Sequence, residues 1–369
     1  MLKNLFKNLS QKHPSFFPIV ILILISTTGV WYLFFSYYPS QEFLQAANNS
    51  VVLTTAARFV SPLDVKNARA KAETLSQVVG VMVDNHPDAR PESGISKAKI
   101  VYEAPVEGGL TRYLAIFDSK QKVGEVGPVR SARSYFLDWL QEYGNALYMH
   151  SGGSPEALTA IKTRKIFDAN EFFLGSYFKR DKDRQAPHNL YTNSDNWRKI
   201  ILSPPARGGV RGGGSGQSAD LFAASKAWKY AKLAGKTIGG KGELKIPYGP
   251  DNMVTWVYDV KKLDYVRSVN GQPEIDKDGA AVRARNILVQ ITSVKEINGD
   301  DKGRVEITTV GSGDAIILKK GSVVYGTWKK ADAKSRTRFY DKNKKEVILA
   351  PGNTWVEIVS TETNVQVTN

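Results

Sequence analysis

Two arginines in the segment GPVRSAR, residues 127–133, have a spacing that suits anion binding. We expect Arg130 and Arg133 to lie at or near the first turn of a helix that Ser131 caps and that runs through Tyr143. Cations there oppose the helix dipole, whereas free backbone N–H groups and guanidinium groups together attract an anion. The anion is either a carboxylate of the protein itself or a carboxylate or phosphate of a ligand.

Two carboxylates in YEAPVEGG form a candidate acid–base pair. Glu103 ends an expected strand, and Glu107 lies in the turn that follows. Neighbouring carboxylates can move each other's pKa apart, and glycoside cleavage uses such a pair about 5–9.5 Å apart. The alternative is that one carboxylate orients an arginine of GPVRSAR and the other caps a turn.

The segment MHSGGSPEA offers a glycine-rich turn before an expected helix. Such a turn can receive an oxyanion, and His150 beside Ser151 or Ser154 could provide a base and a nucleophile. No G-x-S-x-G motif is present, and Ser154 followed by Pro and Glu is typical of a helix N-cap. We therefore expect a structural role for Ser154.

Histidine and aspartate side chains could in principle gather around zinc. The candidates are Asp84, His86, Asp88, His150 and His188. They lack the local spacing of H-E-x-x-H, so we expect hydrogen-bonded structural histidines and no metal. Asn85 and Asn189 could orient the backbone or a ligand amide. No phosphate loop or dinucleotide fingerprint occurs, and we expect no cofactor.

These patterns together predict a polar cleft in the first folded domain. Its expected lining is Asp84, Asn85, Glu103, Glu107, Arg130, Arg133, His150 and His188.

The elements that would position this cleft alternate between strands and helices over residues 77–235, which predicts an α/β or α+β domain. Expected strands include residues 78–84, 100–103 and 110–118. Residues 203–218 are rich in Gly, Pro and Ser and read as a flexible insertion. A helix is expected at 219–234. Residues 242–369 contain short alternating strands, which predict a smaller, mostly antiparallel β domain. Its Trp256, Trp328 and Trp355 are expected in the core.

An uncharged apolar segment, residues 16–38, is long enough to cross a bilayer as a helix. Lysines precede it in a basic tail, residues 1–15, which places the N-terminus in the cytoplasm and the bulk of the chain outside. A cleaved signal peptide is the alternative, but the segment is long and no good cleavage site follows. Residues 39–76 read as a tether.

The composition limits the chemistry further. The chain of 369 residues has no Cys, which excludes disulfides, thiolate metal sites and cysteine nucleophiles. Its formal net charge of +15 suits an anionic partner, although lysines that only solvate the surface are the simpler explanation. An extracytoplasmic location argues against nucleic acid as that partner.

Several motifs resemble the YerB-like family, the DUF3048 proteins, over residues 77–360. They include VMVDNHPDARPESG, TRYLAIFDS, GPVRSARSYFLDW, HSGGSP and APHNLYT, followed by NILVQIT, KKGSVVYGTWKK and NTWVEIV. The resemblance implies an extracytoplasmic protein, often a lipoprotein, with an α/β domain and a smaller β domain. This chain lacks the lipobox Cys. The family's function is unknown, some members are linked to cell-wall synthesis partners, and no catalytic residues carry over.

The sequence thus favours a membrane-anchored cell-envelope protein that binds an anionic wall fragment or a wall-synthesis partner, with the β domain as a docking surface. The alternative is a peptidoglycan hydrolase or transglycosylase with Glu103 or Glu107 as general acid.

Overall fold

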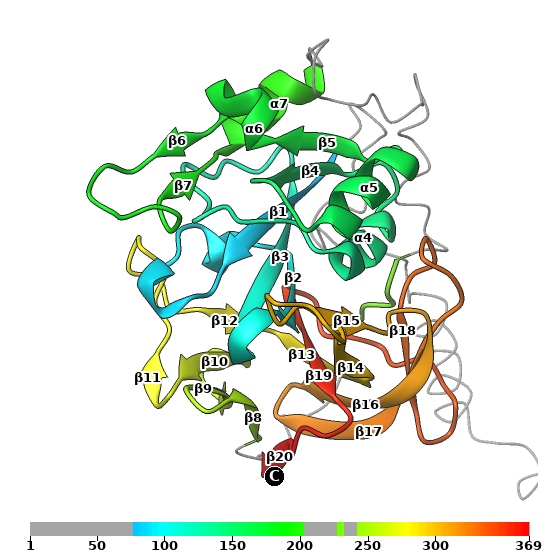
Figure 1. Ribbon diagram of the computed structural model, residues 1–369. Coiled ribbons are helices and arrows are strands. Elements are labelled where there is room, and N and C mark those ends of the chain that lie inside the picture. The colour runs from blue at the N-terminus through cyan, green and yellow to red at the C-terminus, as the bar shows by residue number, and fades with distance from the viewer. Residues whose placement is uncertain (1–76, 203–226, 232–241, 369) are drawn as a thin grey trace, which may run out of the picture. The chain divides into compact units, whose positions relative to one another are not determined.

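The computed structural model describes residues 77–202, 227–231 and 242–368 (Figure 1). The predicted basic tail, membrane span and tether lie outside the described residues, as does the predicted insertion at 203–218. Within the described ranges, no helix is long and apolar enough to span a bilayer.

The dominant element is a mixed sheet of ten strands in the order β18-β17-β16-β13-β19-β2-β3-β1-β4-β5. Its strands are β1 (Val78–Asp84), β2 (Ile100–Pro105), β3 (Thr111–Asp118), β4 (Leu147–His150), β5 (Phe167–Asn170), β13 (Asn286–Thr292), β16 (Gly311–Lys319), β17 (Ser322–Lys330), β18 (Arg338–Asp341) and β19 (Thr354–Ser360). Strands β1, β4 and β5 are parallel, and β3 runs antiparallel between β1 and β2.

Both faces of the large sheet are covered, which explains why β1 is an unbroken apolar run. Val79, Val81 and Val83 belong to one hydrophobic cluster, together with Trp197. Val78 and Met82 belong to a second cluster on the other face.

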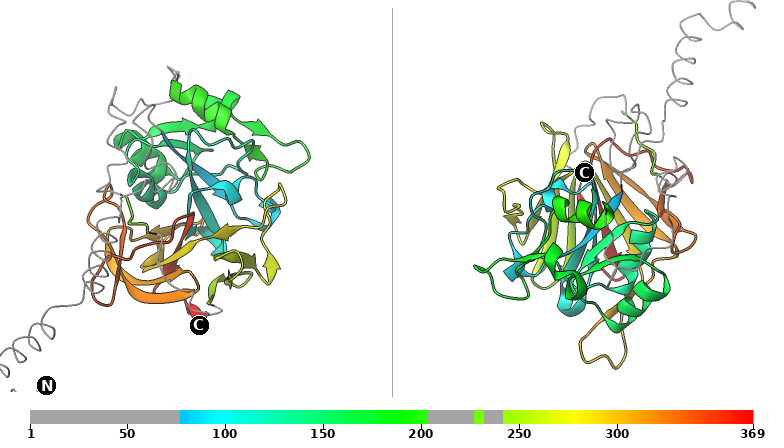
Figure 2. Two further views of the ribbon diagram at one scale, coloured as in Figure 1. Left: turned by 180° about the vertical axis from the view of Figure 1, so that it is seen from behind. Right: turned by 90° about the horizontal axis from the view of Figure 1, so that it is seen from above.

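The helices are short. They are α4 (Ser134–Gln141), α5 (Pro155–Thr163), α6 (Glu171–Leu174) and α7 (Ser194–Leu202), with single turns η1 (Pro87–Ala89), η2 (Ile95–Lys97), η3 (Glu107–Gly109) and η4 (Gly175–Tyr177). Helices α4 and α5 lie side by side in both views of Figure 2 and supply the second cluster, whereas α7 supplies the first.

A separate antiparallel sheet has the order β11-β10-β9-β8-β20, with β12 paired to β10. Its strands are β8 (Glu243–Gly249), β9 (Asn252–Asp259), β10 (Asp264–Val269), β11 (Gln272–Pro273), β12 (Arg283–Ala284) and β20 (Gln366–Thr368). Two small pairs complete the described strands: β6 (Lys179–Arg180) with β7 (Leu190–Tyr191), and β14 (Val294–Glu296) with β15 (Val305–Ile307).

The described chain is therefore mostly β, with few helices. The predicted strand at 78–84 matches β1 to the residue, and the expected β-rich second half is confirmed. One feature was not predicted from the sequence: β13 and β16–β19 belong to the same sheet as β1–β5, because β19 pairs with β2. The prediction of a helix at 219–234 is wrong for its described part, residues 227–231. None of residues 227–231 is helical, and Tyr230 forms a bridge with Leu349.

Candidate functional site

The candidate site lies at one edge of the large sheet, where its parallel strands end. Strands β1, β4 and β5 end at Asp84, His150 and Asn170, and β2 ends at Pro105 at the same edge. Strand β3 begins there, with Arg112 opposite Asp84 in the register. Ligands of open α/β sheets bind outside the carboxyl ends of strands. A ligand is therefore expected at this edge of the sheet.

Residues 127–133 cross this edge as an extended segment. The Asp84 N–H donates to the Pro128 carbonyl over 2.8 Å, the Arg130 N–H donates to the Met82 carbonyl over 2.9 Å, and the Ser151 N–H donates to the Arg130 carbonyl over 3.1 Å. The prediction that Ser131 caps a helix is therefore wrong. The segment uses its backbone groups to join β1 to the loop after β4, and α4 begins only at Ser134.

Asp84 is the centre of the first charged group. Its Oδ2 lies 2.9 Å from Arg130 Nε and 2.7 Å from His188 Nδ1, and its Oδ1 accepts the His86 N–H over 3.2 Å. The Asp84 side chain is 4% exposed, whereas Arg130 is 24% exposed and within reach of solvent. The structure thus brings together Asp84, Arg130 and His188, three of the residues expected to line the polar cleft.

Arg133 forms the second charged group with Glu107. Arg133 Nε donates to Glu107 Oε1 over 2.6 Å, and both side chains are largely but not fully covered. Arg133 stands at the N-cap of α4, where its side chain makes no capping bond. Each arginine of GPVRSAR therefore meets a carboxylate of the protein, which was one of the two alternatives left open by the sequence.

A third arginine at this edge was missed by the sequence analysis. Arg112 is buried, and one of its terminal nitrogens donates to the Ser131 carbonyl over 2.9 Å. Its Nε has no hydrogen-bond partner among the described residues. The pKa of Arg112 is lowered to about 10, mainly by burial and also by nearby Arg133 and Arg130, while Asp84 and Glu107 oppose the decrease. The only sequence signal was a cation on the apolar face of an expected strand.

We call Asp84, Glu107, Arg112, Arg130 and Arg133 the arginine site. Within this set of five residues, three guanidinium groups lie near two carboxylates. A buried cation next to other cations is costly unless an anion is close. The arginine site is therefore suited to an additional anion that approaches from the solvent-exposed side of Arg130.

Glu103 does not line this surface, which corrects the sequence prediction. It is fully buried, and one Arg267 nitrogen donates to both of its oxygens over 2.8 and 2.7 Å. Thr111 and Trp355 donate to it as well. A carboxylate with these partners and no access to solvent cannot protonate a glycosidic oxygen of a bound polymer.

Asn85 is also buried and structural. Its Nδ2 donates to Thr111 Oγ1 over 2.6 Å, and its Oδ1 accepts from Arg90 over 2.8 Å.

His150 is fully buried, so it too lies beneath the surface rather than on it. Its Nδ1 lies 2.6 Å from the Gly152 carbonyl, and its Nε2 lies 2.5 Å from Asp168 Oδ1. Ser151 Oγ donates to Glu171, and Ser154 Oγ accepts the Ala157 N–H as an N-cap. No serine among residues 77–202, 227–231 and 242–368 is bonded to His150. The segment therefore fixes the loop after β4 and is not arranged as a nucleophile with its base.

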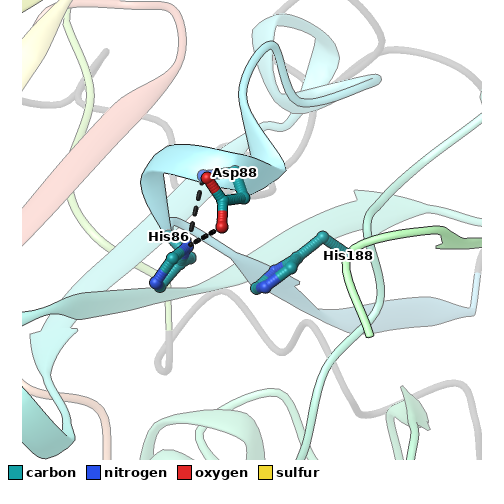
Figure 3. A group of neighbouring side chains, drawn as sticks. All are labelled: His86, Asp88 and His188. Atoms are coloured by element: carbon teal, nitrogen blue, oxygen red, sulfur yellow. Dashed lines mark hydrogen bonds and ion pairs between the residues drawn. The ribbon is translucent and has the colours of Figure 1, made fainter. Parts of the chain in front are cut away.

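His86, Asp88 and His188 form a small cluster (Figure 3). His188 also contacts Asp84. The imidazole rings of His86 and His188 stack with their centroids 4.7 Å apart, and His86 Nδ1 accepts the Asp88 N–H. One potential ligand atom from each side chain lies within 4.8 Å of the other two. Within the described part of the chain, the imidazole nitrogens and the carboxylate of this cluster are close enough together to bind one metal ion.

Comparisons with known proteins bear on family and fold. The family described as "Protein of unknown function (DUF3048)" matches with its N-terminal domain at residues 66–204 and its C-terminal domain at residues 244–356. The chain is 34% identical over 312 residues to the Bacillus subtilis (strain 168) protein named "Putative lipoprotein YerB", across 83% of this chain and 87% of that relative. This chain belongs to the DUF3048 family.

A solved structure of a similar protein has the same fold. The crystal structure of YerB protein from Bacillus subtilis superposes with a TM-score of 0.67 at 30% identity, covering 82% of this chain and 99% of the solved chain. Membership in DUF3048 confirms the resemblance seen in the sequence. The family's description names no activity, so the role of the arginine site rests on its geometry alone.

Proposed function

We propose that this DUF3048 protein is a membrane-anchored, extracytoplasmic cell-envelope protein that binds an anionic wall fragment at the arginine site. The observation that carries the proposal is the buried Arg112 guanidinium, which lies near Arg130 and Arg133 and whose Nε has no hydrogen-bond partner among the described residues. A wall-synthesis protein with an acidic surface is the other partner to be distinguished.

The location is supported by two independent observations. The lysines before residues 16–38 favour an extracytoplasmic bulk, and the relative from Bacillus subtilis carries the word lipoprotein in its name. Peptidoglycan fragments carry carboxylates, which match the bidentate donor pattern of guanidinium groups.

Binding of soluble, fluorescently labelled peptidoglycan fragments to the full chain in detergent tests the proposal. Arg130→Ala combined with Arg133→Ala should weaken binding about 10-fold or more, because hydrogen bonds to charged groups contribute about 1.5–3 kcal/mol. Arg198→Ala is the matched control, since Arg198 pairs with Asp195 on α7 and should leave the affinity unchanged. Equal affinity of the double variant and the parent would refute the proposal.

Glu107→Gln separates binding from hydrolysis. It frees Arg133 from a carboxylate that competes with the ligand, so we expect equal or tighter binding and no released products from intact peptidoglycan. A hydrolase with Glu107 as general acid predicts the reverse: the parent releases soluble products and the variant does not. Tight binding to an acidic wall-synthesis protein, without binding to the fragments, would identify a protein partner instead.

A further inference from the structure

We propose that His86, Asp88 and His188 form a binding site for a divalent transition-metal ion of the zinc class, next to the arginine site. The proposal rests on the geometry of this cluster and does not require that the protein bind wall fragments. We call the three residues the histidine site.

A buried carboxylate holds the His188 ring in place. Its Nδ1 lies 2.7 Å from Asp84 Oδ2, and Asp84 is almost completely buried. With Nδ1 occupied by this carboxylate, Nε2 is the ring nitrogen that remains for a metal. Ligating histidines are commonly held by a carboxylate in this way. Asp84 itself is held by Arg130 and by the His86 N–H, so its position is fixed.

His86 and Asp88 have the separation that a metal requires. His86 Nδ1 lies 3.5 Å from Asp88 Oδ2, and two ligand atoms at 2.0–2.2 Å from a tetrahedral zinc lie about 3.4 Å apart. The Nδ1 atom carries a lone pair here, because it accepts the Asp88 N–H over 3.2 Å. Both side chains come from the same tight turn, η1, which keeps them together (Figure 3).

Metal binding requires a small movement. The rings of His86 and His188 stack at an interplanar angle of 24°, and the three ligand atoms span up to 4.8 Å. The His86 ring must turn about its side-chain bonds and give up the Asp88 N–H. His86 is 37% exposed and Asp88 is 75% exposed, so the rotation displaces solvent and disturbs no packed core.

Three protein ligands leave a coordination position open to solvent. Open sites of this kind bind water or an anionic ligand. Arg130 and His188 both contact Asp84 Oδ2, so an anion bound at the arginine site would lie near the open coordination position.

The test is zinc binding to the full chain in detergent, purified without a polyhistidine tag and in a His13→Gln background. Competition with a chromophoric chelator should show about one zinc ion per chain. Asp88→Ala and His188→Asn should each weaken zinc binding at least 10-fold. Asp195→Ala is the matched control, because Asp195 is an equally exposed acid outside the site. Binding should be unaffected by that change.

The outcomes decide the proposal in either direction. Asp88 is exposed and lies in a surface turn, so Asp88→Ala should fold normally and give a readout even if His188→Asn does not fold. Absence of zinc binding by the parent, or equal affinity of the parent and Asp88→Ala, overturns the histidine site. Wall-fragment binding to Asp88→Ala reports separately on the proposed function, which survives if that binding is unchanged.

Discussion

Burial gives one carboxyl group, Glu92, an unusual protonation behaviour. It is 1% exposed, and the nearest paired cation is Arg90, whose Nε lies 3.9 Å away. Burial raises the pKa of Glu92 to about 7, and Arg90 and Arg267 only partly oppose this increase. The folded protein therefore holds a proton on Glu92 at pH values where the unfolded chain has released it.

The resulting pH dependence of stability can be predicted. Because the folded pKa exceeds the unfolded value of 4.5, the contribution of Glu92 is fully present below about pH 4.5 and is lost as the pH rises to about 7. The loss is about 3 kcal/mol at most. Urea unfolding at pH 5 and pH 8 measures the decrease in the free energy of unfolding. Glu92→Gln should not show this decrease, whereas the exposed control Glu362→Gln should show it as the parent does. Parallel curves for Glu92→Gln and the parent would contradict the assignment.

Among the elements, the strand ends determine where the charges meet. Asp84 and His188 are 104 residues apart in the chain, but β1 and the loop before β7 bring them within 2.7 Å. The extended segment 127–133 adds Arg130 and Arg133, because its backbone pairs with β1 and not with itself. Backbone hydrogen bonds hold the segment at this edge of the sheet, and Arg130 and Arg133 lie there as a consequence.

The proposed location depends on the apolar segment 16–38, and the absence of cysteine makes its orientation easy to test. A membrane-impermeant maleimide should label Asn343→Cys in intact cells, because Asn343 is exposed in the turn after β18. Asn4→Cys, in the basic tail, should be labelled only after permeabilisation. If Asn4→Cys and not Asn343→Cys were labelled in intact cells, the predicted orientation would be wrong.

Across the described residues, buried polar contacts join strands and loops that are distant in the sequence. Glu103 on β2 binds Arg267 on β10. The Asp276 carboxylate accepts the Gly94 and Ser96 N–H groups over 2.9 Å each. Glu357 on β19 accepts from Trp256 on β9. The partners are between 101 and 182 residues apart, so these contacts hold distant parts of the chain in one arrangement.

Glu103 and Glu107 should therefore differ sharply in their effect on stability. Glu103→Gln removes one partner of a fully buried ion pair and should lower the free energy of unfolding by about 3–5 kcal/mol. Glu107→Gln breaks a partly exposed pair and should cost about 1 kcal/mol or less. Chemical denaturation of the two variants measures both. Equal losses would show that the buried network is not the main connection between the sheets.

The local elements were largely predictable from the sequence. The apolar run of β1, the Ser154 N-cap of α5 and the alternating strands of the second half each follow from short-range patterns. The three tryptophans expected in the core, Trp256, Trp328 and Trp355, are buried. The candidate site was predicted in part: Asp84, Arg130 and His188 meet at the strand ends, and Arg133 meets Glu107.

The sequence by itself determined the family, the strand patterns and the segment where charged groups would gather, because these depend on neighbouring residues. Only the tertiary structure decided which charges are accessible. Strand β19 pairs with β2 across about 250 residues, and Glu103 is buried in the resulting core. His150 likewise faces Asp168 and not solvent. Burial and partner choice depend on contacts between distant strands, and no local pattern encodes those contacts.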